Sequence, residues 1–339
     1  MKSKKILVTG GSGYVGTRLI NKIIKQDGIL LVNYDISLFG DEHLPKSNNY
    51  VYLKKDLRDK ISFEKAIKDN NIDTVLHLAC ISNDPTFELR GDISKSINFD
   101  CFEDLVKISK KNNVKKFIYA STCSVYGVSD TPNVTEEHPL VPITDYNKYK
   151  ALCEPVLKKF LDDEFKGVII RPATVCGFSE KMRFDLSVNI LTNYAYNKGY
   201  IRVFGGKQSR PNIHIEDMCS IYENLFEIDF SNINGEIFNA GVENLKIIEI
   251  AEIIKNIFKQ DLKKDIEIKI EPSNDIRSYQ INSDKIQKLL NFKFKYTVKN
   301  AIEDLISEFK KNNLKNTLDP KWQNIQVLKS NPNLINYSK

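Results

Sequence analysis

Six short apolar runs, each followed by a segment with helical periodicity, dominate the first half of the chain. The runs cover residues 5–10, 29–35, 50–56, 73–79, 115–121 and 167–173. Strands that are apolar along most of their length are typical of a parallel sheet, because helices cover both of its faces. Their regular alternation with helices predicts an α/β fold, a Rossmann-type doubly wound parallel sheet with right-handed crossovers.

The alternation loosens after about residue 175, where longer loops separate the helical patterns. These patterns cover residues 186–197, 215–227, 247–259, 283–290 and 298–311. We therefore expect a Rossmann domain over residues 1–175, with strand and helix contributions from about 210–245. Residues 176–311 would mainly form a smaller C-terminal substrate-binding lobe. Residues 312–339 would form an extension that wraps the surface or is partly mobile.

Composition excludes several classes of protein. No run approaches the roughly 20 apolar residues that span a bilayer, and the N-terminus enters a strand without a signal peptide. Six scattered cysteines and four histidines, without metal-ligand spacing, indicate a cytoplasmic protein with reduced thiols and no metal site. The net charge of +6 comes largely from helix lysines interspersed with acidic residues, so we expect no nucleic-acid or membrane partner.

A glycine-rich segment, TGGSGYVG, joins the first strand to the first helix. Gly10, Gly13 and Gly16 permit a tight turn and the close approach of a pyrophosphate to the helix N-terminus. Asp35 ends the second strand, 19 residues past Gly16. Its carboxylate can bond the adenosine ribose and would repel a 2′-phosphate, so the pattern predicts NAD rather than NADP. A glycine-rich turn without a ligand is the structural alternative.

Other residues next to the glycine loop and the strand ends complete the predicted cofactor site. They are Tyr14, Val15, Ile36, Asp56, Leu57, Leu78 and Ala79. Asp56 and Leu57 follow the third strand and are placed to contact adenine. Leu78 and Ala79 follow the fourth strand and would pass near the diphosphate, because the carboxyl ends of parallel strands meet at the ligand-binding edge of the sheet.

The segment TDYNKYK places Tyr146 and Lys150 four residues apart, on one face of a helix that follows the fifth strand. The fifth strand leads into Thr122, so the three side chains can converge. A free phenol has a pKa of about 10 and is a poor base at neutral pH. We expect Lys150 and the cationic nicotinamide to lower the pKa of Tyr146, which then takes a proton as hydride leaves the same carbon for NAD⁺.

TGGxGYxG, the Ser/Thr strand end and YxxxK, in this order, resemble the extended short-chain dehydrogenase/reductases. The resemblance covers roughly residues 5–310 and is to the NAD-dependent nucleotide-sugar epimerase/dehydratase family. It implies that Tyr146 is the base, that Lys150 also holds the nicotinamide ribose and that Thr122 bonds the reacting hydroxyl. Three further residues match positions near the cofactor, namely Asn98, Ser121 and Val175.

The resemblance implies a nucleotide-diphosphate sugar as substrate. Arg210 and Arg277 lie in segments similar to those that carry the family's diphosphate-binding arginines, and a planar guanidinium suits phosphate oxygens. Thr174 stands where the family usually has asparagine. Asn189 is a candidate replacement, with an ordinary helix residue as the alternative. The loop that begins Ser82–Asn83 is expected to lie over the sugar. The resemblance also implies a homodimer, paired through the helices around 93–112 and 146–163.

The residues after Thr122 narrow the reaction. Dehydratases of the family carry Asp-Glu where Cys123 and Ser124 stand, so water elimination lacks its proton carriers. Relatives that epimerise at C3 or C5 place a cysteine where Ser124 stands, and Cys123 should face the other side and pack. Oxidation at C4 remains. It is followed either by release of the keto product or by return of hydride to the opposite face.

Several runs, among them CISNDPTFEL and YNKYKALCEP, resemble a subgroup associated with capsule heptose biosynthesis. This likeness favours 4-dehydrogenation of a GDP-heptose over 4-epimerisation. A non-catalytic NAD-binding regulator is the hypothesis from another class. It predicts the loss of catalytic residues, whereas Thr122, Tyr146 and Lys150 are all present.

Overall fold

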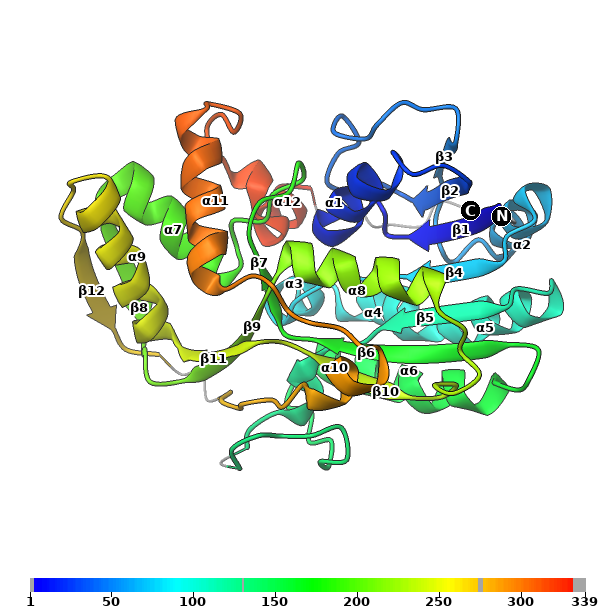
Figure 1. Ribbon diagram of the computed structural model, residues 1–339. Coiled ribbons are helices and arrows are strands. Elements are labelled where there is room, and N and C mark those ends of the chain that lie inside the picture. Colours follow the sequence, from blue (N-terminus) through cyan, green and yellow to red (C-terminus); the bar gives the residue numbers. More distant parts are fainter. Residues whose placement is uncertain (1–2, 130, 274–276, 332–339) are drawn as a thin grey trace.

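A seven-stranded parallel sheet forms the centre of the molecule in the computed structural model, which describes residues 3–129, 131–273 and 277–331 (Figure 1). The strand order is β10-β6-β5-β4-β1-β2-β3. The strands are β1 (Lys4–Thr9), β2 (Ile29–Asp35), β3 (Tyr50–Lys54), β4 (Thr74–His77), β5 (Lys116–Ala120), β6 (Lys166–Pro172) and β10 (Ile237–Ala240). The predicted doubly wound sheet is confirmed, and β10 extends it beyond the six strands expected from the first half of the chain.

Both faces of the sheet are buried, which explains why its strands are apolar on both sides. Ile6 and Val8 of β1 belong to one core and Leu7 to the other, as the alternation of side chains along a strand requires. The first core contains α1 (Tyr14–Ile23) and α8 (Ile215–Glu227). The second contains α2 (Lys60–Asn70), α5 (Phe102–Lys111) and α6 (Asp145–Phe160).

The register of the strands aligns their carboxyl ends. Thr9 of β1 pairs with His77 of β4, which pairs with Tyr119 of β5. The chain therefore leaves these three adjacent strands at almost the same level. The glycine loop, the segment after β4 and the segment that contains Thr122 meet at one edge of the sheet, where the strand order reverses between β1 and β4.

The rest of the chain builds a second lobe beside that edge (Figure 1). Its strands are β7 (Thr174–Cys176), β8 (Tyr200–Phe204), β9 (Ser209–His214), β11 (Glu243–Lys246) and β12 (Glu267–Glu271). Its helices are α7 (Ser187–Lys198), α9 (Ile247–Asp261) and α11 (Val298–Lys310), which share a separate core. Helix α10 (Asp284–Leu289) instead packs beside β10 of the Rossmann sheet, and Ile286 belongs to the core of that sheet. Strands β11, β9 and β7 form one sheet, and β12 pairs with β8 in another.

The chain also forms several short helices and turns. After β4 come α3 (Asp84–Glu88), α4 (Gly91–Lys95) and a π-helical turn (Ser96–Asp100), and 3-10 turns cover Cys123–Tyr126 and Pro320–Trp322. The last described helix, α12 (Asn324–Ser330), packs Leu328 against Ile81. The extension predicted over 312–339 thus returns to the Rossmann side, and residues 332–339 lie outside the described residues.

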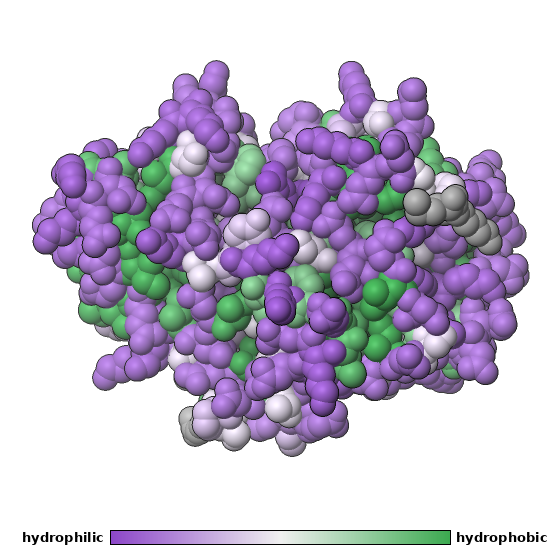
Figure 2. Space-filling model, viewed as in Figure 1, coloured by the Kyte–Doolittle hydropathy of each residue, from purple (hydrophilic) through white to green (hydrophobic). Residues whose placement is uncertain are grey.

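Polar side chains cover most of the face in Figure 2, and the apolar residues on it are scattered over separate areas. Among the described helices, none combines the length and the apolar character that a membrane span requires.

Candidate active site

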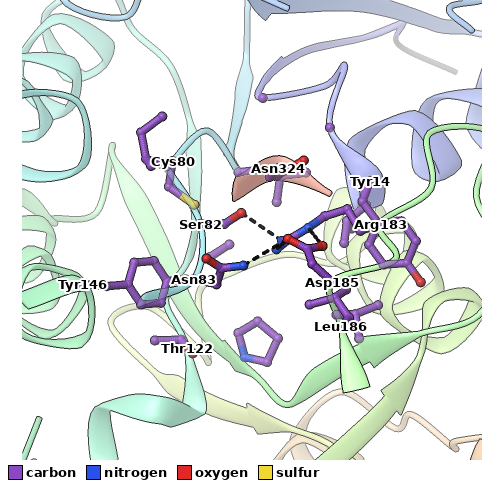
Figure 3. A pocket seen from close by; sticks show the side chains of 18 of the residues that line it. Tyr14, Cys80, Ser82, Asn83, Thr122, Tyr146, Arg183, Asp185, Leu186 and Asn324 are labelled. Carbon is purple, nitrogen blue, oxygen red and sulfur yellow. Dashed lines mark hydrogen bonds and ion pairs between the residues drawn. The ribbon is translucent and has the colours of Figure 1, made fainter. Parts of the chain in front are cut away.

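A cavity of about 920 Å³ lies between the carboxyl edge of the sheet and the second lobe (Figure 3). Its volume is near the upper end of the roughly 300–1,000 Å³ typical of ligand sites. The predicted cofactor residues on its wall are Gly10, Gly13, Tyr14, Val15, Gly16, Asp35, Ile36, Asp56, Leu57, Leu78, Ala79, Ser121, Tyr146, Lys150 and Val175. The predicted substrate residues on its wall are Ser82, Asn83, Thr122, Thr174, Arg210 and Arg277.

The glycine loop packs so closely that Gly10 and Gly16 leave no room for a side chain. Gly10 has φ +75°, and a Cβ there would lie 2.6 Å from the Ala79 backbone. A Cβ on Gly16 would lie 2.5 Å from the Gly10 backbone oxygen. Helix α1 begins directly after Gly13, so its free N–H groups point toward the cavity end that the loop forms.

Asp35 lies beside the glycine loop, as predicted from the spacing. Its carboxylate accepts hydrogen bonds from the backbone N–H of Ser12 at 2.9 Å and of Ser37 at 2.7 Å. Burial raises the pKa of Asp35, and the two backbone N–H groups act in the opposite direction. Each carboxylate oxygen can accept a further bond, so the group can still bind ribose hydroxyls.

Asp56 lines the cavity, but its carboxylate is held by an arginine that the sequence did not single out. Arg58 Nε lies 3.0 Å from Asp56 Oδ1, and Arg58 Nη2 lies 2.7 Å from Oδ2. Arg58 also donates to Ser96 Oγ at 3.2 Å. The predicted adenine contact of Asp56 would therefore involve a carboxylate that Arg58 already orients.

The predicted catalytic residues converge on the cavity. Thr144 caps α6 by accepting a hydrogen bond from the Asn147 backbone N–H, and Tyr146 and Lys150 follow within the first two turns. Figure 3 shows Tyr146 and Thr122 on the same side of the cavity. Thr122 Oγ1 accepts a hydrogen bond of 3.2 Å from the Ser124 N–H, which leaves its own hydrogen free to donate to a ligand.

Lys150 does not by itself bring the pKa of Tyr146 below its usual value, and it is not among the groups that act most on the phenol. Burial raises the pKa of the phenol well above its usual value, and Cys80 and the Asp84 carboxylate act in the same direction. The opposing positive charge is that of Arg183. The Lys150 ammonium instead donates to the Ala120 backbone oxygen at 2.6 Å.

The predicted ligand contacts of Asn98 and Asn189 are corrected, because neither residue lines the cavity. Both amide ends of Asn98 bond the Ile81 backbone, accepting at 2.8 Å and donating at 3.0 Å. Asn98 thus holds the loop after β4 from behind. Asn189 is fully buried. It accepts from the Gly177 N–H and donates to the Tyr14 hydroxyl and the Arg183 backbone oxygen. A buried amide with all these partners is structural, so Asn189 does not replace the family's substrate asparagine.

Cys123 packs as predicted. It is fully buried, and its thiol donates to the Arg171 backbone oxygen at 2.8 Å. Ser124 lines the cavity, and its hydroxyl lies 3.2 Å from the Tyr279 hydroxyl.

Arg183 and Asp185, in the loop between β7 and α7, also line the cavity (Figure 3). The sequence did not single out either residue. They form a bidentate ion pair of 3.0 Å at each contact, and Arg183 also donates to Ser82 Oγ at 2.9 Å. Their sequence signal was weak, because they are two of four charged residues in the loop, which also contains Glu180 and Lys181. Such a pattern is usually solvent-exposed, and only the fold turns it inward.

The two predicted diphosphate arginines come together at the cavity. Arg210 Nη1 donates to the Arg277 backbone oxygen, and the Arg277 guanidinium pairs with the Asp84 carboxylate. Asp84 also accepts a hydrogen bond from the Thr144 hydroxyl. One carboxylate therefore joins the cap of the Tyr146 helix to an arginine of the second lobe. Within the described ranges, no group of three or more His, Cys, Asp or Glu side chains is arranged to hold a metal ion.

Comparison with known proteins agrees with this geometry. Residues 6–241 match the NAD dependent epimerase/dehydratase family. Human dTDP-D-glucose 4,6-dehydratase is 25% identical, over 94% of this chain and 95% of its own length. Escherichia coli dTDP-4-dehydro-6-deoxyglucose reductase is 30% identical, over 74% of this chain and 80% of its own.

A solved structure shares the fold. UDP-glucuronic acid 4-epimerase from Bacillus cereus, in complex with UDP-glucuronic acid and NAD, matches with a TM-score of 0.80 and 23% identity. The match covers 91% of this chain and 99% of that one. These three proteins are named for three different reactions, so likeness to them does not choose among dehydration, reduction and epimerisation. The family match extends over more than half of the chain: the protein belongs to the NAD dependent epimerase/dehydratase family.

Proposed function

We propose that the protein oxidises the C4 hydroxyl of a nucleotide-diphosphate sugar with NAD, and that its substrate is a GDP-heptose, GDP-D-glycero-D-manno-heptose. The observation that carries the reaction is the convergence of Tyr146 and Thr122 on a cavity whose wall also includes the glycine loop and Asp35. A base, a hydroxyl that orients the substrate and a dinucleotide cradle are the parts that such an oxidation needs.

NAD, the cofactor of the family, fits the residues present. The Cβ that Gly16 lacks would press on the Gly10 backbone, so glycine keeps the turn compact and a diphosphate could lie at the N-terminus of α1, and Asp35 would bind the ribose hydroxyls. Bound NAD supplies the hydride acceptor. Lys150, fixed by Ala120, would hold the nicotinamide ribose from α6.

The chain's own groups would handle the proton. Thr122 would donate its hydrogen bond to the C4 oxygen and orient it. Tyr146 would then remove the hydroxyl proton while the C4–H bond breaks and its electron pair leaves as hydride, so that C4 becomes a carbonyl. Burial raises the pKa of Tyr146, so the positive charge of the oxidised cofactor is the change that would make the phenol a usable base.

The arrangement of carboxylates supports oxidation without loss of water. Neither residue after Thr122 is acidic, and Cys123 is packed away from the cavity. Asp84 and Asp185 do line the cavity, but each is in an ion pair, with Arg277 and Arg183 respectively. A carboxylate that neutralises an arginine is a poor carrier for the protons that elimination must move.

The GDP-heptose assignment rests on the sequence runs that resemble the capsule-heptose subgroup. A 4-epimerase is the alternative, because it begins with the same oxidation and then returns hydride to the other face. We propose to incubate the protein and NAD with GDP-heptose, GDP-mannose and UDP-glucose, and to follow NADH absorbance and the products by NMR. A 4-keto heptose formed with equimolar NADH is expected. An epimerised sugar without keto product would replace the assignment by 4-epimerase, and unchanged sugars would reject both.

We also propose that two copies pair through α5 and α6. Leu152 on α6 is 40% exposed although it is apolar, which suits a contact with a second copy. Light scattering should find a dimer, and a single species of 39.0 kDa would contradict the proposal.

A further inference from the structure

A hydrogen-bonded cluster of four side chains stands on the cavity wall near Tyr146. Arg183 and Asp185 come from the loop between β7 and α7, and Ser82 and Asn83 from the loop after β4. Figure 3 shows Arg183 and Asp185 across the cavity from Tyr146, with Asn83 between them. The cluster thus faces the place where the proposed reaction puts the sugar.

The cluster is buried and internally matched. The Arg183 and Asp185 side chains are only 10% and 9% exposed. Arg183 Nε and Nη2 each lie 3.0 Å from an oxygen of Asp185, and Asn83 Nδ2 donates to Asp185 Oδ2 at 3.2 Å. Because the pair is charge-neutral as a whole, the cavity gains no net charge from it.

The cluster still has hydrogen-bonding capacity for a ligand. A guanidinium has five N–H donors, and Arg183 uses three of them, two on Asp185 and one on Ser82. Two donors remain, next to carboxylate oxygens that can accept further bonds. A hydroxyl group both donates and accepts, so it matches such a surface.

A ligand carboxylate would fit the cluster poorly. It could accept from Arg183, but it would have to approach the Asp185 carboxylate in a cavity where water screens little. Asp185 already neutralises Arg183, so the gain from a second carboxylate is small and the repulsion is large. A hydroxymethyl or longer hydroxylated group has no such penalty.

We propose that the Arg183–Asp185 pair determines the sugar class: it accepts sugars with neutral hydroxyl groups on and beyond C6 and rejects sugars with a carboxylate at C6. The inference rests on the proposed function, since it assumes that the sugar ring lies beside Tyr146 and Thr122. The Arg183 guanidinium is within electrostatic range of that place, because it opposes the burial that raises the pKa of Tyr146. A heptose would present its C6 and C7 hydroxyls to the pair.

Matched ligands test the charge at C6 alone. GDP-mannose and GDP-mannuronic acid differ only there, as do UDP-glucose and UDP-glucuronic acid. Calorimetric titration of the NADH-loaded protein should give about tenfold or tighter binding of the neutral member of a pair. Asp185→Asn removes the negative charge with little change of shape. It should reduce that preference by about tenfold or reverse it.

Ser82→Ala is the matched control, because it removes one hydrogen bond of the cluster and no charge. It should weaken both members of a pair alike and leave their ratio unchanged. Retained NAD and an unchanged unfolding temperature show that each variant is folded. The wild-type preference needs no variant, so the proposal can be tested even if Asp185→Asn does not fold.

Three results would overturn the proposal: equal wild-type binding of uronate and neutral sugar, an Asp185→Asn variant with an unchanged ratio, or an Asp185→Asn effect confined to NAD retention. The last result would indicate that Arg183 and Asp185 contact the dinucleotide and not the sugar. Selective binding of neutral sugars without any NADH formation would instead reject the proposed reaction and support the specificity.

Discussion

Lys150 donates a hydrogen bond of 2.6 Å from its ammonium to the backbone oxygen of Ala120, the last residue of β5. The bond ties α6 to the strand that leads into Thr122. The ammonium also lies 5.0 Å from the centroid of the Tyr119 ring. Since its charge is directed at the strand, Lys150 positions the helix of Tyr146. The pKa of the Tyr146 phenol is set mainly by other factors: burial, Cys80 and Asp84 raise it, and Arg183 lowers it.

Tyr146→Phe should lower kcat by roughly 10²- to 10⁴-fold, the usual contribution of a general base. Retention of NAD should not change, because the ring stays in place. Tyr149→Phe is the matched control: Tyr149 is on the same helix and packs its ring against Phe87 and Phe99, away from the cavity wall. Steady-state NADH formation measures both variants. Turnover by Tyr146→Phe at the rate of the control would contradict the role of base.

Asp84→Asn should shift the rise of the pH–rate profile to lower pH. The Asp84 carboxylate adds to the burial that raises the pKa of Tyr146, so its removal makes the phenolate available at lower pH. Asp145→Asn removes a carboxylate from the first turn of the same helix and should leave the profile in place. Rates measured across pH at saturating substrate decide the matter, and a shift to higher pH would reject it.

Gly16→Ala should weaken NAD binding by about tenfold or more, because its Cβ would lie 2.5 Å from the Gly10 oxygen and force the turn open. Gly91→Ala is the control, since a Cβ on Gly91 meets nothing within 4 Å. Fluorescence titration with NADH compares the two proteins. Equal affinities would show that the loop tolerates the added carbon, against the packing described.

Glu154→Gln should reduce the free energy of unfolding by about 3–5 kcal/mol, the usual effect of breaking a buried pair. Glu154 and Arg171 are 4% and 3% exposed and 2.6 Å apart, and Glu154 also accepts from Ser121 Oγ at 2.7 Å. Glu164→Gln breaks an exposed pair with Lys115 and should have no measurable effect. Urea unfolding followed by circular dichroism gives both values. Equal stability of the two variants would contradict the prediction.

Acid should destabilise the protein through His77. Burial lowers the pKa of His77 to about 3, with a smaller effect of Lys150, whereas an unfolded histidine titrates near 6.5. Below that value the unfolded chain binds a proton that the folded one refuses, so stability falls with decreasing pH by up to about 1.4 kcal/mol per unit.

His77→Asn can keep the bond to Thr9 Oγ1 and removes this titration. Between neutral pH and about pH 5, the unfolding temperature of the wild type should therefore fall by more than that of the variant. Parallel curves would show that His77 is not protonated on unfolding.

The sequence by itself determined the sheet, the glycine loop with Asp35 and the nearness of Tyr146 to Thr122. Apolar periodicity and strand-to-helix spacing are local properties, and the parallel register then brings the strand ends to one edge. The need for glycine at positions 10 and 16 could also be predicted from the sequence, because a tight turn after a strand excludes side chains whatever surrounds it.

Only the tertiary structure decided which polar side chains face the ligand and which serve the scaffold. Asn98 and Asn189 turn to backbone groups, whereas Arg183 meets Ser82 from 101 positions away. Arg277 meets Asp84 across 193 positions. Such pairs, and the pKa of Tyr146 that burial raises, depend on distances and on exclusion of water, which long-range packing sets and no local pattern encodes.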